Sequence, residues 1–112
     1  MIDLHCHILP GVDDGSPDAE ISLSMARHAA ESGVTAIAVT PHCNLPGFRR
    51  NYRGPDYRRQ LNGLRELLTQ ENIPLRLYSG AEVFADPSNI RTLIEQHELI
   101  TLGGSRYLLV EF

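Results

Sequence analysis

The sequence contains no lysine, and its ten basic residues are all arginine. The formal net charge is −4, so no overall positive field would attract nucleic acid or an anionic membrane surface. No apolar run approaches the roughly 18 residues of a membrane span, and the N-terminus lacks the basic and apolar regions of a signal peptide. Two cysteines, Cys6 and Cys43, are too few for a disulfide framework. These absences predict a cytoplasmic chain with reduced thiols.

Strand-like and helix-like patterns alternate along the 112 residues, with no internal repeat or linker. Strands are predicted at residues 2–8, 34–40, 74–80 and 106–112. Helices are predicted from a Ser16 cap to Gly33, from 55 to 71 and from Asp86-Pro87 onward. The periodic apolar positions of these helices are Ala19, Leu23, Ala26 and Ala30, then Tyr57, Leu61, Leu64 and Leu68, and finally Ile90, Leu93 and Ile94. This βαβαβαβ series predicts an α/β fold of parallel strands, either a small open sheet or the first half of a barrel.

Several side chains able to bind a metal lie where the predicted strands end. His5 and His7 are two residues apart on the first strand and therefore point to the same face. His42, Glu82 and Glu111 lie at or near the ends of the next three strands. Because the C-terminal ends of parallel strands share one rim, these five side chains are expected to meet there. A mixture of imidazole and carboxylate ligands suits Mn, Fe or Zn.

Two further carboxylates, Asp13 and Asp14, follow the first strand. They are candidate ligands at the same rim, although Asp-Asp-Gly is also a favourable turn sequence. Glu111 has a stronger case, because a carboxylate within the apolar run YLLVEF is costly to bury without a cation or a hydrogen-bond partner. His28 and His97 are expected at the surface.

The segment HCNLPGFR (42–49) offers a different chemistry. Its spacing from Cys43 to Arg49 is that of cysteine-dependent phosphatases, in which a thiolate attacks phosphorus within a loop of backbone amides. Pro46 has no N–H to contribute to such a loop, and no helix is predicted directly after Arg49. A metal-ligand role for His42 is therefore favoured over a nucleophilic Cys43.

Arginines are concentrated beside the rim, interleaved with Phe48, Tyr52 and Tyr57. This cluster is either a solvated loop face or a surface that recruits a phosphorylated or acidic peptide. Its members are Arg49, Arg50, Arg53, Arg58 and Arg59.

The segments MIDLHCHILPGVDDG, TPHCN, GAEV and RYLLVEF together resemble the PHP-fold (polymerase and histidinol phosphatase) protein-tyrosine phosphatases encoded with bacterial capsule and exopolysaccharide genes. The resemblance covers the whole chain and implies that residues 1–112 are the N-terminal part of a single, truncated PHP-type domain. This part would form the first half of a distorted (β/α)7 barrel. Its last strand would leave an unpaired apolar edge that favours self-association.

The resemblance also implies a metal-dependent hydrolysis of phosphotyrosine, chiefly on an autophosphorylated bacterial tyrosine kinase that regulates polysaccharide synthesis. Two or three divalent cations, usually manganese, would be held by residues matched through the motifs. His5 and His7 would bind one cation, Glu82 would bridge to a second that Glu111 also holds, and Asp14 and His42 would bind a third. Arg49 is the candidate for contacting substrate phosphate, and no catalytic residue is expected beyond the ligands.

Two alternatives remain open within this resemblance. Relatives of the same fold include histidinol-phosphate phosphatases and polymerase-associated exonucleases, so a small phosphomonoester or DNA is an alternative substrate. The later half of the family's domain supplies a further His, an Asp-x-His pair and arginines that these 112 residues lack. The chain alone is therefore also considered as an inactive fragment that binds metal.

Overall fold

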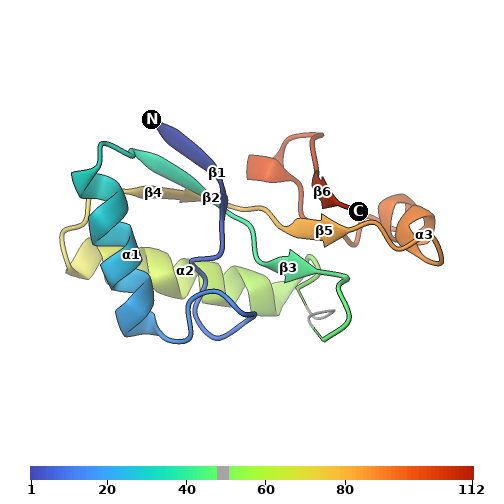
Figure 1. Cartoon of the computed structure of the whole chain (residues 1–112), viewed down its shortest axis with the longest axis horizontal. Helices are drawn as coiled ribbons and strands as arrows, with labels where there is room; N and C mark the ends of the chain where they lie inside the picture. The colour runs from blue at the N-terminus through green and yellow to red at the C-terminus, as the bar shows by residue number, and fades with distance from the viewer. Residues whose placement is uncertain (48–50) are drawn as a thin grey trace.

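Six short strands form two three-stranded sheets in the computed structural model of the chain, which describes residues 1–47 and 51–112 (Figure 1). The first sheet has the order β1 (Ile2–Cys6), β2 (Ala36–Val39) and β4 (Arg76–Tyr78). The second has the order β3 (His42–Cys43), β5 (Glu82–Phe84) and β6 (Leu109–Glu111). Every neighbouring pair is parallel, which confirms the predicted parallel α/β architecture.

Two of the predicted strand regions are each divided into two strands. β2 ends at Val39 and β3 begins at His42, while β4 ends at Tyr78 and β5 begins at Glu82. The backbone groups freed at both interruptions meet one buried hydroxyl. The Tyr57 hydroxyl lies 3.1 Å from the Val39 carbonyl and 2.9 Å from the Gly80 carbonyl, and it accepts the Gly80 N–H at 3.0 Å. Tyr57 thus satisfies polar groups that a continuous ladder would otherwise pair.

Helix α1 (Ala19–Glu31) begins later than the sequence pattern predicts. Its N-cap is Asp18, whose carboxylate accepts the Ile21 N–H at 2.8 Å, so the expectation of a Ser16 cap was wrong. Ser16 is buried, and its N–H donates to the His7 carbonyl at 3.0 Å. Because this hydrogen bond holds Ser16 in the loop after the first strand, the helix is capped by the next suitable residue, Asp18.

Helix α2 (Pro55–Gln70) agrees with the prediction, including its buried stripe of Tyr57, Leu61, Leu64 and Leu68. Helix α3 (Ile90–Glu95) begins later than the predicted start at Asp86-Pro87 and has only six residues. None of its side chains is fully buried, although Ile90 and Leu93 pack against the core. A short 3-10 helix, η1 (Leu102–Gly104), follows it. The Leu102 N–H donates to the Tyr107 carbonyl at 2.9 Å, which closes a turn, so β6 begins at Leu109 rather than at the predicted residue 106.

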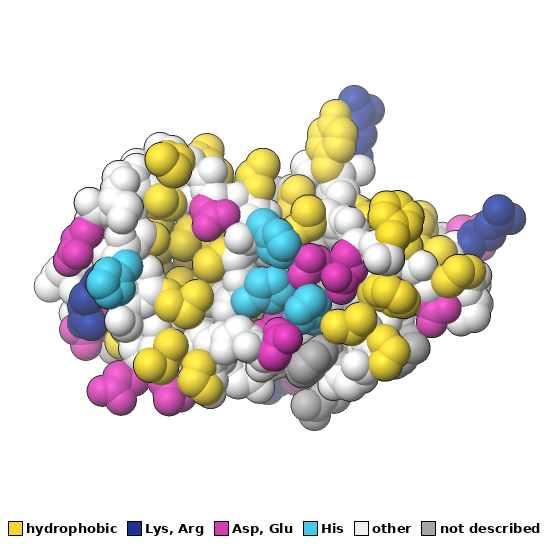
Figure 2. Space-filling model, in the orientation of Figure 1, with side chains coloured by type: hydrophobic (Ala, Val, Ile, Leu, Met, Phe, Trp, Pro, Cys, Tyr) yellow, Lys and Arg dark blue, Asp and Glu magenta, His cyan; other side chains and the backbone are white. Residues whose placement is uncertain are grey.

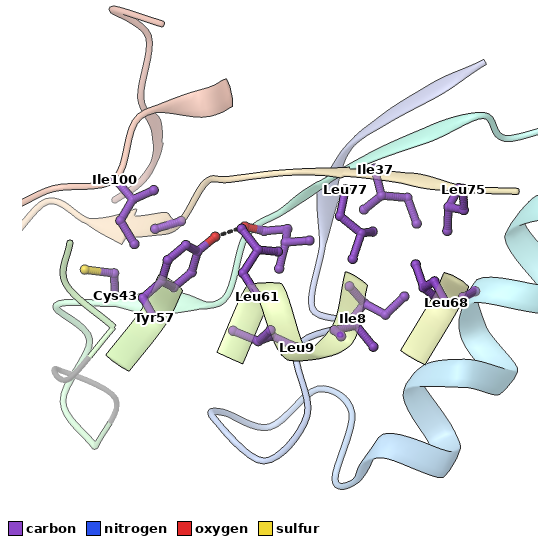
Figure 3. Close-up of a cluster of buried hydrophobic side chains, with 14 of the residues drawn as sticks. Ile8, Leu9, Ile37, Cys43, Tyr57, Leu61, Leu68, Leu75, Leu77 and Ile100 are labelled. Atoms are coloured by element: carbon purple, nitrogen blue, oxygen red, sulfur yellow. Dashed lines mark hydrogen bonds between the residues drawn. The ribbon is translucent and has the colours of Figure 1, made fainter. Parts of the chain in front are cut away.

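The apolar core lies between α2 and the sheet β1–β2–β4 (Figure 3). Leu61 and Leu68 from α2 face Ile37 of β2 and Leu77 of β4 in this cluster. Ile8 and Leu9 follow β1 and are fully buried, so the chain turns into the core immediately after His7. This burial fixes where the loop that follows the first strand begins. In the described part of the chain, no helix combines the length and apolar character needed to cross a membrane.

Candidate metal centre

Glu82, the first residue of β5, lies against three histidine rings. Its Oε2 is 3.2 Å from Nε2 of His5. Its Oε1 is 3.1 Å from Nε2 of His7 and 3.3 Å from Nδ1 of His42. Parallel pairing sets His42 of β3 beside Glu82, and the space-filling view shows histidine and acidic side chains gathered on one face (Figure 2). One carboxylate therefore joins imidazoles from two separate parts of the chain.

The two remaining predicted ligands approach His42 from opposite sides of its ring. Oε1 of Glu111, at the end of β6, lies 3.3 Å from Nδ1 of His42. Oδ1 of Asp14 lies 3.4 Å from Nε2 of the same ring. The side chain of Asp14 is 69% exposed, whereas Glu111 is half-buried. All six residues expected as ligands are therefore brought into one cluster.

The six side chains form three overlapping groups whose ligand atoms lie within 4.8 Å of one another. The groups are His5, His7 and Glu82, then His7, Asp14 and His42, and finally His42, Glu82 and Glu111. Each residue can present a nitrogen or oxygen lone pair, as Mn, Fe and Zn sites require. Glu111 fits the role of a metal ligand. Its Oε1 is buried and, although it lies 3.3 Å from Nδ1 of His42, it accepts no hydrogen bond from the described residues. A cation would compensate both this oxygen and the mutual repulsion of the carboxylates.

Asp13 belongs to none of the three groups but contacts two of the proposed ligands, His7 and His42. Its Oδ2 lies 2.9 Å from Nδ1 of His7 and accepts the backbone N–H of His42 at 2.9 Å. Since a carboxylate only accepts, Nδ1 of His7 carries the proton in the neutral ring, and the lone pair of Nε2 is left for a ligand bond. Burial opposes ionisation of Asp13, but hydrogen bonds from His7 and from the backbone of His42 and Gly15 outweigh it and lower its pKa.

The sequence pattern presented Asp13, together with Asp14, as a candidate ligand or as a turn residue. The turn interpretation is correct in part, because Oδ1 of Asp13 accepts the Gly15 N–H at 2.9 Å. The same carboxylate also contacts the ring of His7 and the backbone N–H of His42, and the sequence pattern did not predict these contacts. Gly15 itself matters for space, because a Cβ built there would overlap Cβ and the carbonyl oxygen of His7.

Asn51 was missed entirely by sequence reasoning. It is buried, and its side-chain nitrogen donates to the His42 carbonyl at 2.6 Å and lies 3.3 Å from the Val12 carbonyl. It therefore links the segment carrying His42 to the loop carrying Asp13. Asn51 lies in a loop without periodicity, so no pattern distinguishes it from a solvated asparagine.

Neither cysteine has the environment of a nucleophile. Burial raises the pKa of Cys43 to about 12, and burial together with the charge of Asp3 raises the pKa of Cys6 to about 11. Both thiols are therefore protonated near neutral pH, whereas the thiolate is the reactive form. Arg49, the predicted phosphate contact, lies outside the described residues. His28 and His97 are exposed, as predicted.

Comparison with known proteins places these residues in a family context. The family model described as capsular polysaccharide synthesis, CpsB/CapC, matches residues 1–112. The chain is 37% identical to the tyrosine-protein phosphatase YwqE of Bacillus subtilis and 34% identical to the tyrosine-protein phosphatase CpsB of Streptococcus pneumoniae. Both matches cover the whole chain, but the chain spans only 43% and 45% of the respective relatives.

A solved structure has the same fold. It belongs to a study of YwqE from Bacillus subtilis and CpsB from Streptococcus pneumoniae, described there as unique metal-dependent tyrosine phosphatases. The superposition has a TM-score of 0.89 at 36% identity and covers 100% of this chain but 44% of the solved one. The parallel α/β unit therefore corresponds to less than half of that longer structure.

Proposed function

Because this chain belongs to the capsular polysaccharide synthesis family CpsB/CapC, we propose that it supplies metal-binding residues of a protein-tyrosine phosphatase. The observation that carries the proposal is the convergence of three histidines on Glu82, with Glu111 and Asp14 beside His42. The names of the matched relatives support a phosphotyrosine substrate. We further propose that the substrate is an autophosphorylated bacterial tyrosine kinase of capsular or exopolysaccharide synthesis, and that the reaction occurs in the cytoplasm.

The proposed ligands are His5, His7, Asp14, His42, Glu82 and Glu111, holding two or three divalent cations, with manganese as the leading candidate and iron or zinc as alternatives. Such cations supply Lewis acidity toward phosphate oxygens and lower the pKa of bound water. Glu82 belongs to two of the three groups and is therefore the proposed bridge. Asp13 holds the proton on Nδ1 of His7, which keeps Nε2 available.

The domain assignment is part of the same proposal. Residues 1–112 would form the N-terminal part of a single PHP-type domain, the first half of a distorted (β/α)7 barrel. The parallel order of the strands and the 44% coverage of the solved structure support this assignment. Arg49 is retained as the proposed contact to substrate phosphate, although it is outside the described residues.

Chelation of the full-length protein tests the proposal. Hydrolysis of a phosphotyrosine peptide and of p-nitrophenyl phosphate should be lost after metal removal and should return with Mn²⁺, compared in parallel with Zn²⁺ and Fe²⁺. Glu82→Gln should abolish the recovery, whereas Glu66→Gln, an exposed carboxylate change on α2, should not. Activity that resists chelation would contradict the metal mechanism. Preference for histidinol phosphate or DNA in the same assay would contradict the substrate assignment.

Metal binding without turnover is the second candidate function for the 112 residues by themselves. The coverage of only 43% of the YwqE relative favours it, since the remaining length has room for further active-site residues. Metal content and phosphatase rate would be measured together on the 112-residue chain and on the full-length protein. Equal turnover per bound metal in both would exclude this candidate.

A further inference from the structure

A cavity of about 850 Å³ opens between α2 and residues 97–108. Its apolar wall includes Leu61 of α2 together with Leu99, Ile100 and Leu108. None of the six candidate metal ligands lines it, so it is separate from the metal centre. The volume lies within the roughly 300–1,000 Å³ of typical ligand sites.

The charged residues lining this cavity have one sign. Among the residues that the structure describes, they are Arg53, Arg58, Arg65 and Arg106, joined by His97, and no described aspartate or glutamate lines the cavity. We call this surface the arginine groove. Its charge contrasts with the net charge of −4 of the chain. The predicted arginine cluster is thus divided, because Arg53 and Arg58 enter the groove while Arg59 does not.

The arginines of the groove also lack the ion pairs formed by arginines elsewhere. Arg27 pairs with Glu71 at 3.1 Å, and Arg59 pairs with Asp56 at 3.2 Å. Within residues 1–47 and 51–112, no carboxylate forms an ion pair with any of the four arginines of the groove. Their charge is therefore available to a ligand.

One of these guanidinium groups is held in place by the protein. Nε and Nη2 of Arg65 donate to the Leu77 carbonyl at 3.2 and 2.6 Å, and Nη1 donates to Asn62 at 3.0 Å. Anchoring lowers the entropy that this long side chain would lose on binding an anion. Arg106 lies 5.9 Å from the Tyr107 ring centre and faces the groove from the segment before β6.

The arrangement of the charges indicates the kind of ligand. Arg58 and Arg65 are seven residues apart on α2, about 10 Å along its axis, and Arg53 and Arg106 lie on other segments. A single phosphate is usually gripped by donors that converge on one point. Exposed guanidinium groups spread along an open groove instead match several carboxylates along an extended chain. We propose that the arginine groove binds an acidic polypeptide segment of a partner protein.

Peptide binding to the full-length, metal-free protein tests this site separately from the phosphatase reaction. The probe is a fluorescein-labelled peptide of eight glutamates, and its control is the same peptide with glutamines. Fluorescence anisotropy should show binding of the glutamate peptide only, and the binding should weaken as salt screens the charges. The double variant Arg58→Gln/Arg106→Gln should weaken it about tenfold.

A matched double variant, Arg76→Gln/Arg91→Gln, removes the same charge from exposed positions that do not line the groove. It should alter affinity less than about twofold, as expected for distant surface charges. Equal weakening by both double variants would overturn the proposal in favour of nonspecific attraction, and so would no binding of the glutamate peptide. Complete displacement of the peptide by an equal concentration of inorganic phosphate would indicate a simple anion site and also overturn it. Because no metal is present, each outcome leaves the phosphatase proposal untouched.

Discussion

Nδ1 of His7 lies 2.9 Å from Oδ2 of Asp13, so one carboxylate fixes how the ring of a proposed metal ligand is turned. Asp13→Ala removes this contact and the acceptor for the His42 N–H. Affinity for Mn²⁺ is expected to fall by about 10- to 100-fold, the usual effect of losing a residue that orients a ligand. Isothermal titration calorimetry measures the affinity. Asp56→Ala, an exposed change away from the cluster, should leave it unchanged, and unaltered affinity in Asp13→Ala would refute the orienting role.

Glu82 and Glu111 should differ in how many cations they help to hold. Glu82 takes part in two of the three ligand groups, whereas Glu111 takes part in one. Glu82→Gln is therefore expected to lower the number of Mn²⁺ ions bound per chain more than Glu111→Gln does. Elemental analysis after equilibration with Mn²⁺ gives these numbers. The same loss in both variants would argue against Glu82 as a bridge.

The cysteines should be slow to react and dispensable for activity. With a pKa of about 12, Cys43 is thiolate in only about one molecule in ten thousand at pH 8. Alkylation by iodoacetamide should therefore accelerate only at strongly alkaline pH, with Cys6 reacting before Cys43 because its pKa is about 11. Mass spectrometry follows both sites. Loss of phosphatase activity in Cys43→Ala with normal metal content would revive the cysteine mechanism.

Tyr57→Phe should destabilise the fold with little direct effect on the ligands. The substitution leaves the Gly80 N–H and the Val39 carbonyl without their shared hydroxyl partner in a buried place. The expected loss is about 1–3 kcal/mol in the free energy of unfolding. Urea denaturation measures it, and Tyr78→Phe on an exposed residue is the control. Equal midpoints for the two variants would contradict the role assigned to the hydroxyl.

Two glycine substitutions should have opposite effects. A Cβ at Gly15 would overlap the backbone and Cβ of His7, so Gly15→Ala should cost at least about 1 kcal/mol and weaken metal binding. At Gly63, within α2, a Cβ meets nothing within 4 Å, and Gly63→Ala should stabilise the protein by about 0.5–1 kcal/mol. Thermal unfolding and Mn²⁺ titration distinguish the two. Stabilisation by Gly15→Ala would show that the loop adjusts freely.

Much of the fold follows from periodicity. The spacing of Leu61, Leu64 and Leu68 identified α2, and the uninterrupted apolar run identified β2, because burial imposes regular patterns on both. The interruptions after Val39 and Tyr78 were not predicted, since the freed backbone groups are satisfied by the Tyr57 hydroxyl, which is distant in sequence. The predicted start of α1 was wrong because Ser16 and Asp18 are both residue types that cap helices well. The hydrogen bond from the Ser16 N–H to the His7 carbonyl holds Ser16 in the loop, and Asp18 caps the helix instead.

The candidate site likewise contains residues that the sequence predicted and residues that it did not. Five of the six proposed ligands could be named from the sequence because strand ends bring His5, His7, His42, Glu82 and Glu111 to one rim. Asp14 lies in a loop, and its choice over Asp13 came from the family resemblance. Which acid faces His7 depends on the exact course of the loop, and so Asp13 was not recognised as its partner. Asn51 and the division of the arginine cluster depend on tertiary contacts between segments, which residue spacing does not encode.

The contacts of Glu82 with His5, His7 and His42 have a consequence for folding kinetics. The cluster joins positions from 5 to 111, so its contacts span nearly the whole chain and close large loops. Such long-range contacts are slow to form, and the full cluster exists only when β1, β3, β5 and β6 are assembled. A cation that binds the assembled cluster and not the unfolded chain adds stability in proportion to the logarithm of its concentration. The rate at which a refolding chain gains metal affinity therefore measures how fast β1, β3, β5 and β6 come together.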